Sequence, residues 1–183
     1  MLPPKLDIGR DDYYQAGIAG CLDFDRSPFL TTPGAASLGT AIVSANPYGP
    51  LSVFGAVLNG NTISGFQQNV TIQLGNTPGV AGSFLEIDFT GFSVENGRTL
   101  TIRSGASGQT VLIRNASATA SVLGGLLQAQ GGNGAAAPGL YLQDPNGMTI
   151  NSTSTILAQA GLTIDTLGGT VTSGNKLLNL GWI

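Results

Sequence analysis

Short apolar segments recur at close and regular intervals in the last part of the chain. Their first residues are Leu140, Met148, Ile156, Leu162, Thr170 and Leu177. Successive segments begin 6 to 8 residues apart, with a turn between each pair. This interval is too short for helices and suits a chain that coils with three short strands in each turn. The pattern predicts an all-β fold of the parallel β-helix, or β-solenoid, type.

Charged side chains are few. The 183 residues include seven basic and ten acidic side chains, 28 glycines and no histidine. The usual general acid and base and the commonest neutral metal ligand are therefore missing, and we predict a non-enzymatic protein without a cofactor. The net charge of −3 and the absence of a basic cluster argue against nucleic acid as a partner. No apolar run approaches the ~18 residues of a membrane-spanning helix.

Residues 27 to 85 carry no charged side chain at all. One interpretation is that Ser, Thr, Asn and Gln side chains solvate an ordinary surface. The other is that a further subunit covers part of this stretch, because the centres of protein interfaces are depleted of charge. The second interpretation predicts a homo-oligomer formed through residues 27 to 85.

The chain divides into two regions by composition. Residues 1 to 50 hold six prolines, which fix φ and remove backbone donors, so we expect an irregular N-terminal arm or cap there. A short helix over residues 11 to 22 is the one regular element expected in it. Residues 51 to 183 are expected to form the β-helix, since the segments 69–74 and 85–89 alternate polar with apolar residues. The open end of such a coil needs a cap, because its strand edges are unpaired.

Two carboxylates could carry chemistry. Glu86 and Asp88 are two residues apart on one expected strand and therefore share a face. An enzymatic alternative, glycan cleavage on a β-helix, would use them with Arg103 or Arg114. The favoured interpretation is a solvated strand face, because exposed carboxylates are common. The acidic residues near the amino terminus do not have the spacing of a calcium loop, so no metal site is predicted.

A tight turn is predicted at Asp144, Pro145, Asn146 and Gly147. Pro145 sets φ for the first corner position, and Asn146 or Gly147 takes the left-handed one. Asp144 can accept a hydrogen bond from the backbone of its own turn. The tetrapeptide therefore has a structural role and no chemical one.

This turn, in the segment GLYLQDPNGM over residues 139–148, resembles one in a known family. The family is the amino-terminal secretion domain of filamentous-haemagglutinin-type exoproteins of two-partner secretion systems. In it an NPNG turn follows a Leu-rich strand, and residues 121–131 and 89–100 resemble the segments expected upstream. The resemblance covers roughly residues 68 to 166. Asp144 departs from the family's asparagine, and only a short segment follows where the family continues into a long β-helix.

The resemblance implies a right-handed β-helix that is secreted or displayed at a bacterial cell surface, as a secretion or adhesion module. It also implies recognition by the periplasmic modules of an outer-membrane partner transporter, through strand addition. By this analogy the partner-binding candidates are Asn69, Ile72, Leu74, Phe89, Phe92 and Val94. The alternative function is a self-assembling structural subunit of an extracellular filament, surface layer or virion.

Overall fold

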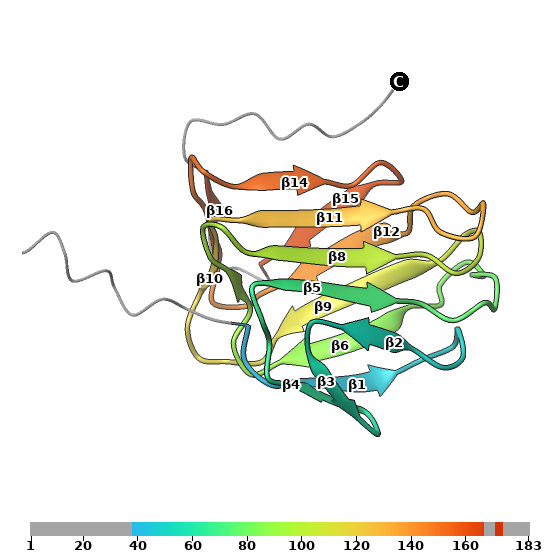
Figure 1. Cartoon of the computed structure of the whole chain (residues 1–183). Coiled ribbons are helices and arrows are strands. Elements are labelled where there is room, and N and C mark those ends of the chain that lie inside the picture. The colour runs from blue at the N-terminus through green and yellow to red at the C-terminus, as the bar shows by residue number, and fades with distance from the viewer. Residues whose placement is uncertain (1–37, 167–170, 174–183) are drawn as a thin grey trace, which may run out of the picture. The chain divides into compact units, whose positions relative to one another are not determined.

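The computed structural model describes residues 38–166 and 171–173 (Figure 1). These residues belong to one compact unit, Ala35–Ile183. They form strands, turns and bends, and no helix occurs among them. The helix expected over residues 11–22 and most of the expected N-terminal arm lie outside the described residues.

Twelve strands wind into a β-solenoid of four rungs, with three strands in each rung. The first rung consists of β5 (Asn69–Gln73), β6 (Leu85–Phe89) and β7 (Ser93–Val94), and the second of β8 (Thr99–Arg103), β9 (Thr110–Asn115) and β10 (Ser121–Leu123). The third consists of β11 (Leu126–Gln130), β12 (Gly139–Gln143) and β13 (Met148–Ile150), and the fourth of β14 (Thr155–Leu157), β15 (Leu162–Asp165) and β16 (Val171–Ser173). The chain climbs about three turns from the first rung to the last.

Strands of successive rungs pair in parallel and build three walls. We call them wall B (β5, β8, β11, β14), wall A (β6, β9, β12, β15) and wall C (β7, β10, β13, β16). Figure 1 shows the strands of wall B stacked one above another at the front. The predicted all-β parallel β-helix is confirmed, because every pairing between rungs is parallel.

The core runs along the inside of the solenoid in columns of apolar residues. One column of wall A consists of Leu85, Val111, Leu140 and Leu162, which are in register across the four rungs. The first three are at most 2% exposed. Alternation along strands such as β6 and β9 places one set of side chains in this core and the other set outside. Each rung thus buries its apolar residues against the rungs above and below.

Four antiparallel strands cover walls A and B at the first rung. They are β1 (Ala41–Ala45), β2 (Ser52–Phe54), β3 (Val57–Asn59) and β4 (Thr62–Ser64), which we call the N-terminal cap. β1 pairs with β6 of wall A, and β2 pairs with β5 of wall B, both antiparallel. Gly60, with φ of 57°, forms the tight turn that joins β3 to β4. The cap therefore lies across the boundary expected at residue 50.

Buried amide groups hold the corners of successive rungs together. The Gln109 side chain is 3% exposed and donates to the carbonyls of Gly75 (2.7 Å) and Thr77 (2.8 Å). Its oxygen accepts from the Gly105 amide at 2.9 Å. A Cβ at Gly105 would collide with the Gly75 carbonyl, so the close stacking of these corners requires glycine.

Candidate functional site

The structure places most of the partner-binding candidates in the core. Five of the six are at most 2% exposed: Ile72, Leu74, Phe89, Phe92 and Val94. Asn69 alone among them is exposed, at the start of β5. The five apolar side chains therefore pack the solenoid and do not form a contact surface in this structure. Recognition at these segments would have to use their backbone.

The backbone of one of these segments has an edge that no other described strand pairs with. β7 is the terminal strand of wall C and pairs with β10 alone among the described strands. The neighbouring strands of the first rung, β5 and β6, each have a partner on both sides. Of the three walls at the cap end, wall C is thus the one that no described strand covers. An uncovered edge offers N–H and C=O groups to an added strand.

The N-terminal cap exposes three large apolar side chains. Phe54 is 61% exposed, Val57 60% and Ile42 49%. Phe54 and Val57 flank the bend at Gly55, where φ is +84° and a Cβ would collide with the Asn69 carbonyl. Phe54 faces outward because its neighbour Val53 pairs with the core residue Ile72. All three lie in the uncharged stretch of residues 27 to 85.

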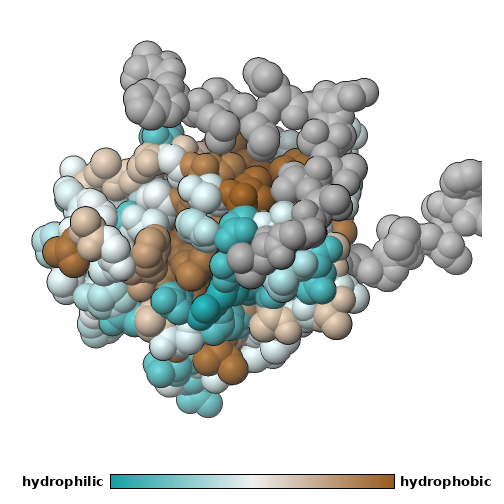
Figure 2. All heavy atoms as spheres, turned by 180° about the vertical axis from the view of Figure 1, so that it is seen from behind, coloured by the Kyte–Doolittle hydropathy of each residue, from teal (hydrophilic) through white to brown (hydrophobic). Residues whose placement is uncertain are grey.

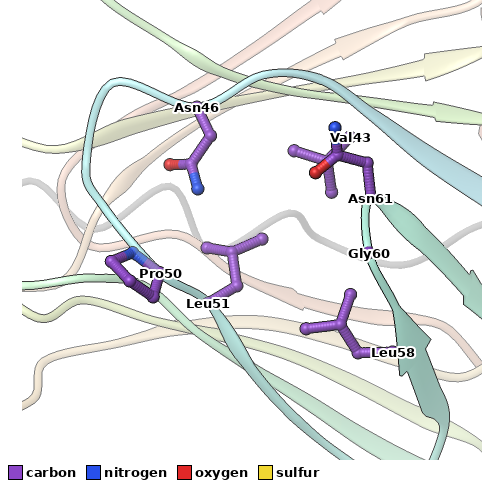
Figure 3. A pocket seen from close by; sticks show the side chains of 7 residues that line it. All are labelled: Val43, Asn46, Pro50, Leu51, Leu58, Gly60 and Asn61. Carbon is purple, nitrogen blue, oxygen red and sulfur yellow. The ribbon is translucent and has the colours of Figure 1, made fainter.

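A small cavity lies in the same cap. Its lining residues are Val43, Asn46, Pro50, Leu51, Leu58, Gly60 and Asn61. Figure 3 shows the side chains of Asn46, Leu51 and Leu58 around it, between β1, the loop that follows β1, and the β3–β4 hairpin. Its volume of about 190 Å³ is below the ~300 Å³ at which ordinary small-molecule pockets begin. The cavity is therefore better suited to one side chain than to a substrate.

Arg114 lies between the two carboxylates that were candidates for catalysis. Its Nε donates to Asp88 Oδ1 at 2.6 Å, and its Nη2 donates to Glu86 Oε2 at 2.7 Å. The hydrogen bond to Asp88, with the charges of both acids, raises the pKa of Arg114. Arg103 lies on wall B, where its Nε donates to the Gly131 carbonyl at 3.4 Å. Glu86 and Asp88 are thus held in an ion-pair cluster with one arginine.

The polar row on wall A continues from this cluster toward the last rung. Asp88, Arg114, Gln143 and Asp165 are in register across the four rungs. The Tyr141 hydroxyl donates to Asp165 Oδ2 at 2.9 Å, and this hydrogen bond raises the pKa of Tyr141. Figure 2, which views the structure from behind, shows hydrophilic groups lying between apolar patches. The hydrogen bonds and ion pairs of this row therefore join surface side chains on neighbouring strands.

The predicted turn contains a buried carboxylate. Asp144 is fully buried, and its Oδ2 accepts from Asn115 Nδ2 (2.8 Å), from the Ser121 amide (2.7 Å) and from Ser121 Oγ (2.5 Å). Its Oδ1 accepts from the Asn146 amide at 2.9 Å, and Gly147 has φ of 96°. The turn therefore joins the third rung to the second. The turn has a structural role, because both oxygens of the Asp144 carboxylate accept hydrogen bonds from protein donors.

The described residues offer no assembled site for a metal. No group of three or more His, Cys, Asp and Glu side chains lies close enough there to hold an ion. Within the same residues every buried side-chain polar atom has a hydrogen-bond partner. No helix in that part of the chain is long and apolar enough to cross a membrane.

Comparison with known proteins leaves the chain without an assigned family. No protein-family model, curated protein or solved structure matches it. The resemblance to two-partner secretion domains therefore rests on the residues of this chain alone.

Sequence reasoning did not identify the exposed cap residues or the β7 edge. A strand with one partner has the same alternation of residues as a strand with two, so the β7 edge leaves no signal in the sequence. The sequence does contain a signal for the exposure of Phe54. Val53 and Phe54 are adjacent and both apolar, and only one of two adjacent strand residues can face the core.

Proposed function

We propose that the chain is a non-enzymatic β-helix module, secreted or displayed at a bacterial cell surface, that binds a protein partner through a strand edge. The observation that supports this proposal best is the β7 edge, since the cap covers walls A and B of the first rung and no strand among the described residues covers wall C. The partner expected from the family resemblance is an outer-membrane transporter of the two-partner type.

Strand addition fits the chemistry of this edge. Backbone groups supply the hydrogen bonds, so recognition does not require exposed side chains of a particular type. Ser93 and Val94, the residues of β7, are both buried, and their side chains belong to the solenoid. An extended segment of the transporter would pair with β7 and continue wall C toward the cap.

The test is hydrogen exchange on the intact chain, with and without the soluble periplasmic modules of a two-partner transporter. We expect the Ser93 amide to exchange more slowly when the module is bound. Val94 is not a reporter, because its carbonyl accepts from the Gly124 amide and its backbone groups therefore face β10. The amides of β10, which already lies between two strands, serve as the control and should not change. Binding that leaves the Ser93 amide unaffected would overturn the proposed edge, and a failure of all modules tested to bind would count against the secretion role.

A second function, a self-assembling structural subunit, has its own supporting observation. The exposed Phe54, Val57 and Ile42 of the cap lie in a stretch without charge, as expected of a surface that another copy covers. Light scattering after size exclusion, over a range of protein concentrations, distinguishes the two functions. A persistent monomer near 18.5 kDa favours the secretion module, and growth with concentration favours assembly.

If the chain assembles, matched variants locate the interface. The double variant Phe54→Ser, Val57→Ser should reduce the assembled mass toward that of the monomer. Val80→Ser removes an apolar side chain that is 69% exposed but lies outside the cap, and should leave the mass unchanged. Equal behaviour of the two variants would exclude the cap as the interface.

A further inference from the structure

Four asparagines of the chain are followed directly by glycine, and each pair coincides with a tight turn. The pairs are Asn59–Gly60, Asn96–Gly97, Asn133–Gly134 and Asn146–Gly147. Such an asparagine can lose its side-chain amide spontaneously, because glycine has no Cβ to hinder attack by its backbone nitrogen. The attack requires a nitrogen free of hydrogen bonds and a peptide unit that can rotate. The four turns differ in both respects.

Asn96 and Gly97 occupy the two central positions of the turn that joins β7 to β8. The Arg98 amide donates to the Glu95 carbonyl at 3.0 Å, which closes the turn. Gly97 has φ of 77° and Asn96 has a negative φ, as in a type II turn. The peptide between Asn96 and Gly97 takes no part in the closing hydrogen bond. With glycine after it, this peptide can flip while the turn stays closed.

The ends of this turn are held while its centre is free. The side chains of Glu95 and Arg98 form an ion pair at 2.8 Å across it. The Leu126 amide, in the next rung, donates to the Arg98 carbonyl at 2.9 Å. Asn96 and Gly97 are exposed, and no group among the described residues forms a hydrogen bond with the Asn96 side chain or with the Gly97 amide. The reacting groups are therefore unrestrained in a turn that remains formed.

The turn at Asn146 and Gly147 is the opposite case. Here the Gly147 amide itself closes the turn by donating to the Asp144 carbonyl at 3.1 Å, and Gly147 is buried. The Asn146 side-chain amide donates to the Ser117 carbonyl at 2.8 Å. Both reacting groups are thus held by hydrogen bonds that must break before the nitrogen can attack.

The other two asparagines each have one restraint. Asn59 is a residue of β3 and pairs with Thr62, so rotation of its peptide would disturb the β3–β4 hairpin. Asn133 has φ of 52°, and its side-chain amide donates to Asn76 Oδ1 at 3.2 Å. Asn96 is therefore the asparagine of the four with neither kind of restraint.

We propose that Asn96 deamidates in the folded chain faster than the other three asparagines that precede glycine. The Gly97 nitrogen bonds to Asn96 Cγ, the Cγ–Nδ2 bond breaks, and ammonia leaves with the proton that the Gly97 nitrogen gives up. Water then opens the succinimide ring, at Cγ to give aspartate or at the main-chain carbonyl to give isoaspartate. Nothing is oxidised or reduced, and each event lowers the formal net charge of −3 by one. This inference does not depend on the partner proposed for β7.

Peptide mass spectrometry measures all four asparagines in one sample of the native chain. The chain is incubated in mildly alkaline buffer made with heavy-oxygen water, so that each ring opened during the incubation takes up a heavy oxygen. We expect Asn96 to react fastest. Asn146 should react at least about tenfold more slowly, because its hydrogen bonds must break first. A rate at Asn96 equal to or below that of any of the other three would overturn the proposal.

The unfolded chain is the control, because the four pairs are chemically alike. In guanidinium chloride we expect comparable rates at all four asparagines. If Asn96 leads there by the same margin, its sequence neighbours and not its turn cause the reactivity, and the proposal is wrong.

The products test the route of the reaction. Asn96→Asp supplies the reference peptide for the aspartate product, so a peptide of the same mass and a different retention time is isoaspartate. We expect both products from the native chain. Formation of the aspartate peptide alone would show direct hydrolysis of the side chain and would overturn the attack by Gly97.

Discussion

Ser121 Oγ donates a 2.5 Å hydrogen bond to the buried carboxylate of Asp144, 23 residues later in the sequence and one rung higher in the solenoid. The Ser121 amide and Asn115 Nδ2 donate to the same carboxylate oxygen, and the Asn146 amide donates to the other. All four groups are donors, so the site requires a side chain that only accepts. This requirement gives a physical reason for aspartate, and not asparagine, at this position.

Asp144→Asn should therefore destabilise the solenoid by about 1–3 kcal/mol. Whichever way the amide is oriented, its NH₂ group faces a donor that the carboxylate had satisfied. The unfolding midpoint in urea is the measurement.

Asn146→Ala is the control for this prediction, in the same turn. Asn146 is exposed, and its side chain makes one hydrogen bond, to the Ser117 carbonyl at 2.8 Å. Its removal should cost no more than about 0.5 kcal/mol. Equal costs for the two variants would show that the buried carboxylate has no special role.

Tyr48 links the N-terminal cap to the second rung. Its side chain is 1% exposed, and its hydroxyl accepts from the Thr110 amide at 2.9 Å and lies 2.9 Å from the Ser83 carbonyl. Tyr48→Phe leaves both groups without this partner and should cost about 1–3 kcal/mol, measured by urea unfolding. Tyr141→Phe, which removes one hydroxyl at the surface, should cost less. The opposite order would contradict the assigned role of Tyr48.

The rungs could be predicted from the sequence because each strand is specified locally. Segments such as 85–89 alternate strictly, and turns such as Asp144 to Gly147 contain residues suited to left-handed φ. A coil of short strands repeats these signals at intervals too small for helices. The strand positions and the β-solenoid fold follow from them.

The cap and the face of each strand were harder to predict. Parallel and antiparallel strands share the same period of two, so the sequence of residues 41–64 does not distinguish a capping hairpin from a further rung. The family resemblance predicts Ile72 and Phe89 as partner contacts, yet the apolar members of an alternating strand are the ones that face the core. Tyr48 contacts Thr110 across 62 residues, and no local pattern records such a pair.

The ion pair on wall A gives a prediction that depends on salt. Arg114→Gln leaves Glu86 and Asp88 on one face without the cation between them. The three side chains are 27–35% exposed, so the variant should lower the free energy of unfolding only modestly. We expect a loss of about 0.2–1 kcal/mol at low salt and less at high salt. Urea unfolding at the two salt concentrations measures it.

Arg98→Gln is the control for the ion pair, since Arg98 contacts one acid, Glu95, at 2.8 Å. It should show a smaller dependence on salt than Arg114→Gln, because it leaves one carboxylate unpaired and not two. A larger dependence for Arg98→Gln would mean that the two acids of wall A do not depend on Arg114.

Tyr141 should make the stability of the chain depend on pH in the alkaline range. The protonated hydroxyl donates to Asp165, so the folded state raises the pKa of Tyr141 above its ordinary value of about 10. The stabilisation is fully present below the ordinary pKa and is lost as the pH rises through the raised one. The difference in phenolate absorbance between the native chain and Tyr141→Phe should therefore titrate above the ordinary value. Asp165→Asn should bring this titration back toward that value, and a titration of the native chain at or below it would show that the hydrogen bond does not hold the proton in solution.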